Sequence, residues 1–297
     1  MELMSHSSTF LLQPENPDAA SSSSVSLTYA LIVLNQPLPK FTPLLWSHAH
    51  IRVCADGGAN RLYDEMPLLF PLEDPSHIRS RYTPDAIKSD MDSVKTEVLD
   101  FYAKLVLLFV NLNVHVMERI ISELNLLDSL QIAITGPYVE GFVVFIIDES
   151  KDQDTTDLHK CVAYLRDLTP NTDKSELCIL VAGALGGRFD HEIGNINVLC
   201  LFSNTRIILL SNDCLIHLLP KNHSHKIFIQ SVEGPHCGLV PIGIPCGSST
   251  TTGLEWDLND MEMRFGGLIS TSNILKGDIV TVQSDSDLLW TVSINKL

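Results

Sequence analysis

Short apolar runs alternate with amphipathic stretches over most of this chain. A run such as Leu177–Ala182 is apolar throughout, which is typical of a strand buried on both faces of a parallel sheet. The stretches between such runs repeat apolar residues at helical spacing. We predict strands at Tyr29–Leu34, Ile51–Ala55, Asp85–Ile87, Phe142–Ile147, Leu177–Ala182 and Arg206–Leu210, and helices at Ser93–Lys104, Thr156–Asp167 and His191–Phe202. This alternation indicates an α/β fold with a parallel, Rossmann-like sheet.

The pattern changes after Asn212, where short alternating segments are separated by Gly, Pro, Asn or Ser and no helical pattern interrupts them. Such a texture predicts an antiparallel β-sandwich. We expect its strands at Cys214–Leu219, His225–Val232, Gly238–Ile242, Met263–Thr271, Asp278–Gln283 and Leu288–Ile294. The chain therefore divides into an α/β domain at 28–212 and a β-sandwich domain at 213–297. Residues 1–27 are serine-rich and contain no Lys or Arg, which predicts a disordered tail and not a signal or transit peptide.

One segment, Leu105–Gly141, does not fit the α/β rhythm. It begins with the 13-residue stretch Leu-Val-Leu-Leu-Phe-Val-Asn-Leu-Asn-Val-His-Val-Met, which contains two Asn and a His, and it lies where an α/β unit needs only a short loop. The stretch is too short and too polar for a membrane span. We interpret the segment as an atypical insertion, with a retained intron or an alternative gene model as the hypothesis for its origin. A dominant transcript that encodes it, found by sequencing across codons 100–150, would contradict that hypothesis.

Composition narrows the classes of function. Apolar residues make up 45% of the 297 positions and charged residues 19%, as in ordinary soluble globular proteins. A net charge of −16 argues against a nucleic-acid-binding surface, which is normally basic. The seven cysteines are scattered and never form C-x-x-C, which indicates reduced thiols in a cytosol-like compartment. We expect a cytoplasmic protein that binds neither nucleic acid nor membrane.

Four aspartate-bearing clusters follow the predicted strands, at 54–60, 87–93, 152–157 and 183–191. In parallel α/β sheets, ligands bind beyond the carboxyl ends of the strands, so the sequence places all four clusters on one edge. Carboxylates that converge repel one another by roughly 4 kcal/mol per pair at about 4 Å and a dielectric near 20. A fold brings them together mainly to hold a cation, and oxygen ligands favour Mg²⁺ or Ca²⁺.

Each cluster also has a structural interpretation. In Asp56-Gly57-Gly58 the glycines permit positive φ and close approach of a ligand, but a plain strand-to-helix turn has the same pattern. Asp90 and Asp92 lie on one side of an extended segment. Asp154 and Asp157 mark a helix start, where capping explains one of them.

The strongest single element is Gly183-Ala-Leu-Gly-Gly-Arg-Phe-Asp-His191. Its glycines open a concavity of phosphate size, the next helix start offers N–H groups, and Arg188 offers a planar fork for phosphate oxygens. It is not a P-loop, since no Lys-Ser/Thr follows the last glycine. His191 at the helix start is more often a hydrogen-bonding residue than a general base.

Taken in order, the motifs D-G-G-A-N-R, P-D-x-I-x-x-D-x-D-S, D-Q-D-x-T-D and G-x-x-G-G-R-x-D-H resemble the thiamine pyrophosphokinase family in its plant-type form. Thr250–Trp256 and Ser270–Asn273 are similar to segments of that family's thiamine-binding domain. The resemblance runs from about Ala30 to the C-terminus, apart from Leu105–Gly141.

The resemblance implies Mg²⁺-dependent transfer of pyrophosphate from ATP to thiamine, giving thiamine diphosphate and AMP, by a homodimer whose sites use both subunits. Asp90, Asp92 and Asp157 would be catalytic, with Asp92 or Asp157 as the candidate base. The resemblance assigns the metal to Asp56, Asp90, Asp92 and Asp157, contacts with the nucleotide or its phosphates to Arg188 and Asp190, and the lining of the adjoining site to Gln153 and Asp154. It also counts Gly57, Gly58, Asn60, Gly186 and Gly187 among the ligand-binding residues, and it assigns thiamine to Trp256, Ser272 and Asn273.

Ser89, directly before Asp90, stands where the family usually has glycine. If that position needs positive φ, serine costs on the order of 1 kcal/mol or more. Ser89 and the insertion leave open an alternative, a catalytically impaired isoform that binds nucleotide or pairs with intact subunits. A further alternative is another Mg²⁺-dependent, Asp-rich phosphohydrolase.

Overall fold

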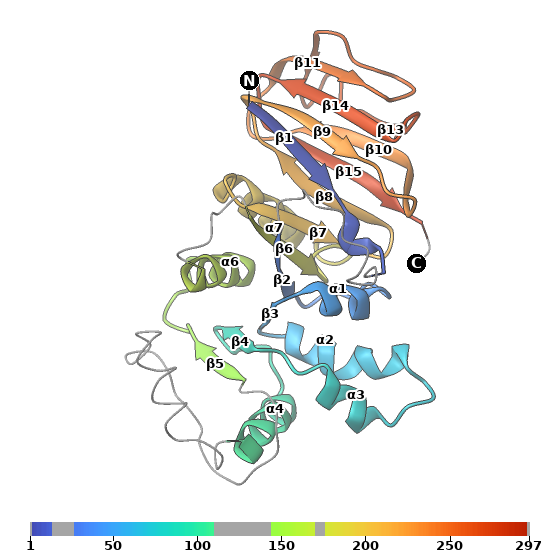
Figure 1. The fold of residues 1–297 in the computed structure, drawn as a ribbon. Coiled ribbons are helices and arrows are strands. Elements are labelled where there is room, and N and C mark those ends of the chain that lie inside the picture. Colours follow the sequence, from blue (N-terminus) through green and yellow to red (C-terminus); the bar gives the residue numbers. More distant parts are fainter. Residues whose placement is uncertain (1, 14–26, 110–143, 170–175, 296–297) are drawn as a thin grey trace.

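The N-terminal half is built on a parallel sheet. The computed structural model describes residues 2–13, 27–109, 144–169 and 176–295 (Figure 1). Six parallel strands stand in the order β7-β6-β2-β3-β4-β5. They are β2 (Thr28–Val33), β3 (Ile51–Ala55), β4 (Ala86–Ser89), β5 (Phe145–Asp148), β6 (Leu177–Ala182) and β7 (Arg206–Leu210). The predicted α/β class is confirmed.

Helices cover both faces of this sheet, which is why its strands are apolar throughout. Alternate residues of β2 show the division: Leu31 packs into the core on one face and Ile32 into the core on the other. The first face is covered by α1 (Thr42–His48), α2 (Gly58–Glu65), α3 (Pro75–Arg81) and α4 (Thr96–Phe109), and the second by α6 (Asp157–Leu168) and α7 (Phe189–Leu201). Among the described residues no helix is both long and apolar enough to cross a membrane.

The C-terminal region continues the same sheet and adds a second one. β8 pairs antiparallel with β7, so that one ten-stranded sheet runs through both regions and the predicted 212/213 boundary falls in a turn within it. The sheet is extended by β8 (Cys214–Leu219), β15 (Leu288–Ile294), β10 (Glu233–Pro241) and β13 (Ser270–Ile274). The second sheet contains β1 (Glu2–Ser7), β9 (His223–Phe228), β14 (Ile279–Ser284), β11 (Cys246–Thr252) and β12 (Met261–Met263). Val282 and Trp290 share the core between the two sheets, as expected of a sandwich.

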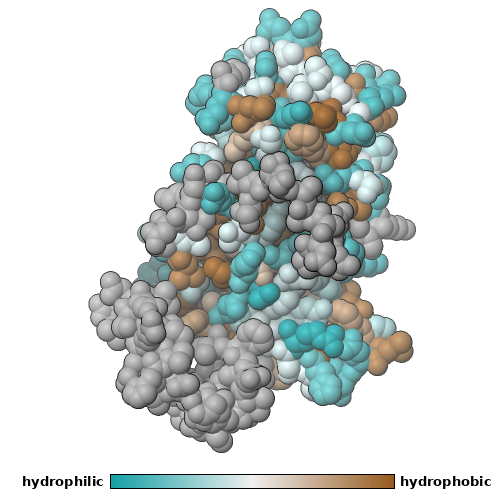
Figure 2. Space-filling view, viewed as in Figure 1, coloured by the Kyte–Doolittle hydropathy of each residue, from teal (hydrophilic) through white to brown (hydrophobic). Residues whose placement is uncertain are grey.

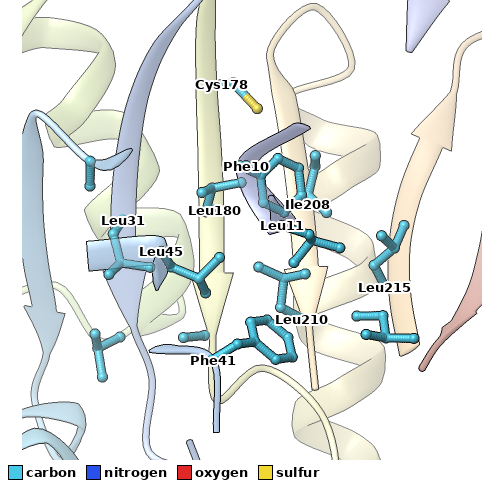
Figure 3. Close-up of a cluster of buried hydrophobic side chains, with 14 of the residues drawn as sticks. Phe10, Leu11, Leu31, Phe41, Leu45, Cys178, Leu180, Ile208, Leu210 and Leu215 are labelled. Atoms are coloured by element: carbon cyan, nitrogen blue, oxygen red, sulfur yellow. The ribbon is translucent and has the colours of Figure 1, made fainter. Parts of the chain in front are cut away.

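The expectation of a disordered tail at 1–27 is wrong for residues 2–13. β1 pairs in parallel with β9, and Phe10 and Leu11 in the short helix η1 (Thr9–Leu11) are each 1% exposed. Figure 3 shows both side chains beside Leu180, Ile208 and Leu210 of the central sheet. The serine-rich composition of the segment concealed its folded part. One edge strand and two buried apolar side chains need only a few residues, too few to change the average composition. Residues 14–26 lie outside the described part.

Two other strand predictions differ from the structure. Met263–Thr271 is not one strand, since β12 ends at Met263 and β13 begins at Ser270. β11 is an additional strand made largely of Ser and Thr, with Ser249 and Thr251 buried. Polar side chains of this size fit a strand when their hydroxyls are bonded, so a hydrophobic pattern misses them. Of the predicted insertion, residues 110–143 lie outside the described residues.

Candidate active site

Three aspartates converge where β3 and β4 end. Asp56 follows β3, and Asp90 and Asp92 follow β4, the neighbouring parallel strand. One carboxylate oxygen from each lies within 4.8 Å of the others. The structure therefore brings the first two predicted clusters together. The donor set is three carboxylates with no nitrogen or sulfur ligand, which fits a hard cation such as Mg²⁺.

Asp56 is held in one orientation by the loop after β4. Its carboxylate accepts hydrogen bonds from the backbone N–H of Ser93, at 3.0 Å, and of Val94, at 2.9 Å. Burial raises the pKa of Asp56, and these hydrogen bonds act in the opposite direction. Asn60 binds the same loop, donating to the carbonyl of Ser93 and accepting from the N–H of Lys95, both at 2.9 Å. Asp56 and Asn60 thus join the first cluster to the second.

The glycines after Asp56 serve packing. A Cβ on Gly58 would lie 2.0 Å from the carbonyl oxygen of Val33, so only glycine allows α2 to start this close to β2. The expectation that these glycines supply a positive φ is wrong for Gly57, whose φ is −58°. Asp56 itself has a φ of 43° and Met91, between the paired aspartates, a φ of 60°. The left-handed backbone therefore lies at and between the acids, where it turns the carboxylates toward one another.

Asp157, at the start of α6, reaches the same region through Ser89. The Ser89 hydroxyl donates to Oδ1 of Asp157 and lies 3.5 Å from Oδ1 of Asp90. Burial raises the pKa of Asp157, the Ser89 hydrogen bond opposes this, and the charge of Asp90 adds to the rise. The strain expected for Ser89 is absent: it ends strand β4 in register with Asp148 and is not among the residues with positive φ.

The rest of the third cluster lies at the surface. Gln153 and Asp154 are exposed, and the Gln153 amide donates to the carbonyl of Ser150. Asp152 organises this turn by accepting from the N–H groups of Asp154 and Thr155. Thr156 caps α6, so the cap is this threonine and Asp157 is free for another role.

Two buried lysines near the acids were missed in the sequence. Lys88, next to Ser89, forms an ion pair with Glu149, and its Nζ lies 5.1 Å from the ring centroid of Tyr164. Lys160 follows Asp157 by one helical turn and is also buried. Buried lysines are rare. Lys88 lies two residues before Asp90 of the D-x-D motif, and that proximity was the available signal; nothing local distinguishes Lys160.

The fourth cluster forms a separate, open loop before α7. Gly186 has a φ of +93°, and the N–H groups of Gly186 and Gly187 both donate to Glu192, at 2.8 and 3.0 Å. Arg188 and Asp190 are exposed and bound to each other. No described contact joins Arg188 or Asp190 to the three converging aspartates. The N–H groups of Gly186 and Gly187, two residues expected to bind the ligand, are therefore occupied by a carboxylate of the chain itself.

The C-terminal motif Thr250–Trp256 forms a turn that displays an aromatic ring. Asp257 accepts hydrogen bonds from Thr251, Gly253 and Leu254 and so closes the turn. Trp256 is 59% exposed. Asn273 is 2% exposed, and its amide binds the backbone N–H and carbonyl of Trp256 at 3.1 and 2.9 Å. Ser272, beside it, is exposed with a φ of 56°.

Two protein-family models match this chain, one over most of the α/β region and one over most of the C-terminal region. The family model described as "Thiamin pyrophosphokinase, catalytic domain" matches residues 42–115 and 127–209. The model described as "Thiamin pyrophosphokinase, vitamin B1 binding domain" matches residues 224–289. Within the predicted insertion, only residues 116–126 fall outside the first match.

Individual relatives are similar to this chain over all or nearly all of its length. The chain is 55% identical to thiamine pyrophosphokinase 1 of Arabidopsis thaliana over 297 residues, covering 100% of this chain and 95% of the relative. It is 52% identical to thiamine pyrophosphokinase 1 of Oryza sativa subsp. japonica, covering 98% and 97%. The crystal structure of yeast thiamin pyrophosphokinase has a similar fold, with a TM-score of 0.67, 24% identity and coverage of 100% and 92%. These comparisons give no support to an impaired isoform.

Proposed function

Because the chain belongs to the thiamin pyrophosphokinase family and therefore transfers pyrophosphate from ATP to thiamine, we propose that Asp56, Asp90 and Asp92 hold the Mg²⁺ for this transfer. The observation that carries the proposal is the approach of their three oxygens to within 4.8 Å. Such an arrangement of like charges is costly without a cation. Bound Mg²⁺ would neutralise charge on the triphosphate and align it for attack.

The reaction divides the roles among the residues. The hydroxyl oxygen of thiamine attacks the β-phosphorus of ATP, the bond from that phosphorus to the α,β-bridging oxygen breaks, and AMP leaves with that oxygen. Transfer of this kind asks the protein mainly for alignment and charge neutralisation. The hydroxyl proton needs an acceptor, and we assign this role to Asp92, a member of the cluster, or to Asp157, which borders it. Asp157→Asn leaves the three converging aspartates intact, so a large fall in kcat in that variant would favour Asp157 as the base, and a small one Asp92.

We assign the binding of the triphosphate to the edge of the sheet around the cluster. The candidate contacts are Gly57, Gly58, Asn60, Gln153, Asp154, Gly186, Gly187, Arg188 and Asp190. The observation that supports the assignment differs among these residues. The N–H groups of Gly186 and Gly187 already donate to a carboxylate oxygen, which shows that they can bind an anion, and Arg188 and Asp190 are exposed to a ligand. Asn60 and the buried Gly58 act by shaping the site.

We assign thiamine to the C-terminal region, where Trp256 offers an exposed ring for a cationic ligand. Ser272 is exposed beside the turn and offers a hydroxyl. The vitamin B1 binding match, at residues 224–289, includes both residues. Asn273 takes part by holding the Trp256 backbone, since its amide is buried and already bonded.

We infer a homodimer with shared sites from where these parts lie. Figure 1 shows β11, which leads into the Trp256 turn, at the top of the molecule, and β3 and β4 in its lower half. Thiamine stacked on Trp256 would not meet ATP at the acidic cluster of the same chain. A second subunit would bring the two together. Figure 2 shows hydrophobic residues at the surface of the C-terminal end, and Met261 and Phe265 are exposed near Trp256 in the sequence.

We also propose a cytosolic location. All seven cysteines are free in the structure, and five of them are buried in the α/β and sandwich cores without a partner sulfur. An oxidising compartment favours disulfides, which such a set of thiols does not form. Microscopy of the fluorescently tagged chain tests the location; retention in an organelle would contradict it.

The function is tested by incubating the purified chain with ATP, Mg²⁺ and thiamine and measuring AMP and thiamine diphosphate. The Asp90→Asn, Asp92→Asn double variant is expected to lose more than about 100-fold in rate, since a catalytic metal supplies several kcal/mol. A matched control is Asp213→Asn with Asp278→Asn, two exposed acids in turns of the C-terminal region. Equal rates in both double variants would refute the metal assignment. ATP breakdown independent of thiamine would indicate a hydrolase.

A further inference from the structure

Ser89 is a buried hydroxyl in the acidic site. It is the last residue of β4 and is 0% exposed. Its carbonyl accepts from the N–H of Glu149 at 2.8 Å, and it is in register with Asp148, so the neighbouring strand β5 fixes its backbone. The direction of the side chain is therefore set by the sheet.

The Ser89 hydroxyl has one proton, and it faces two carboxylates. It donates to Oδ1 of Asp157, while Oδ1 of Asp90 lies farther away, at 3.5 Å. Among the described residues, no other group donates a hydrogen bond to the Asp157 carboxylate. Ser89 thus fixes the rotation of a carboxylate that projects from a different element, α6.

Asp157 is not one of the three acids whose oxygens converge, but it borders them through Ser89. We propose that Ser89 is a positioning residue, whose hydroxyl holds the Asp157 carboxylate beside Asp90 and thereby strengthens the binding of a divalent cation at the acidic site. This inference rests on the metal site proposed above. Its physical basis is general: hydrogen-bond partners of metal-binding carboxylates orient them, and losing such a partner typically weakens metal binding 10–100-fold.

Mn²⁺ binding to the full chain without nucleotide tests the proposal, with free Mn²⁺ followed by electron paramagnetic resonance. We expect Ser89→Ala to weaken Mn²⁺ binding by about tenfold. If Ser89 acts through Asp157, the same substitution made in an Asp157→Asn background is expected to change binding by less than about twofold. Unchanged binding in Ser89→Ala, or an equal loss in both backgrounds, would overturn the proposal.

Two controls separate this result from other causes. Ser249→Ala removes another fully buried serine hydroxyl, in β11, and is expected to leave Mn²⁺ binding unchanged. The Asp90→Asn, Asp92→Asn variant tests the metal site itself. If it binds Mn²⁺ as the wild type does, the proposed function fails and the inference fails with it. If the Asp90→Asn, Asp92→Asn variant loses Mn²⁺ binding but Ser89→Ala binds Mn²⁺ as the wild type does, only the inference about Ser89 fails.

Turnover supplies a second readout. Ser89→Ala is expected to raise the Mg²⁺ concentration needed for half-maximal rate by about tenfold, with the KM for thiamine unchanged. A general disturbance of the fold would alter both. A rise in the KM for thiamine without any change in Mg²⁺ dependence would contradict the assigned role.

Discussion

The side-chain amide of Asn273 holds the backbone of Trp256 from both sides. Its oxygen accepts from the Trp256 N–H at 3.1 Å and its nitrogen donates to the Trp256 carbonyl at 2.9 Å. The amide also bonds Ser270 and the N–H of Ile274. Because these four hydrogen bonds occupy the side-chain amide, we infer that Asn273 acts on thiamine through the orientation of Trp256.

Removing the indole is expected to weaken thiamine binding selectively. A cation–π contact contributes about 0.5–2 kcal/mol, so Trp256→Ala should raise the KM for thiamine by roughly 2–30-fold while the KM for ATP stays unchanged. Trp256→Phe keeps a weaker π face and should lose less. Initial rates of AMP formation at varied thiamine measure this. An unchanged KM for thiamine in Trp256→Ala would exclude the stacking role.

Asn273→Ala is expected to raise the KM for thiamine in the same direction, because the turn loses the two hydrogen bonds that fix it. The decisive result is the combination with Trp256→Ala. If Asn273 acts through the indole, the double variant should lose little beyond Trp256→Ala alone, since the effects are not additive. Two independent losses that add would show instead that Asn273 contacts the ligand directly.

Glu192 is expected to compete with phosphate. It accepts from the N–H groups of Gly186 and Gly187, and these cannot also donate to a triphosphate oxygen at full strength. Glu192→Ala should therefore lower the KM for ATP by about 2–10-fold, which corresponds to the roughly 0.5–1.5 kcal/mol of an ordinary hydrogen bond. Steady-state rates at varied ATP and saturating thiamine measure this. A higher KM would mean that Glu192 keeps the loop in its binding form.

Stability is expected to fall with acid through a buried histidine group. Burial lowers the pKa of His217 to about 4, and burial also lowers the pKa values of His6 and His225. In the unfolded chain these histidines have pKa values near 6.5, so the unfolded chain binds more protons than the folded protein between about pH 6.5 and pH 4. The free energy of unfolding is therefore highest above about pH 6.5 and falls as the pH drops toward about 4. For His217 alone the loss is about 3 kcal/mol.

Urea unfolding at pH 7.5 and pH 5 checks this. His217→Gln should reduce the stability difference between the two pH values by roughly 2 kcal/mol, because that side chain no longer titrates. An equally steep pH dependence in His217→Gln would show that other groups cause the loss. The acidic residues titrate in both proteins and cancel in the comparison.

The sequence was sufficient for the parallel part of the sheet and for the convergence of Asp56, Asp90 and Asp92. Buried parallel strands have apolar runs, and the strand-end rule needs no tertiary information. The link between Ser89 and Asp157 was not predictable, because it joins two elements whose separation depends on side-chain packing. The occupation of Gly186 and Gly187 by Glu192 was hidden for the same reason.

Burial of the N-terminal residues was missed for a different reason. Composition averages over a segment, while docking depends on single side chains such as Phe10 and Leu11. Asn273 shows a third limit. The resemblance gave it a ligand contact, and only its burial and its four hydrogen bonds reveal that it supports Trp256.

In the function that we propose, Asp56, Asp90 and Asp92 hold a divalent cation. Anomalous diffraction from crystals of this chain grown with Mn²⁺ locates the cation itself, because Mn²⁺ takes the same oxygen ligands as Mg²⁺. We expect an anomalous peak within about 2.5 Å of carboxylate oxygens from all three residues. A map with Mn²⁺ bound elsewhere, and no peak between these aspartates, would contradict it.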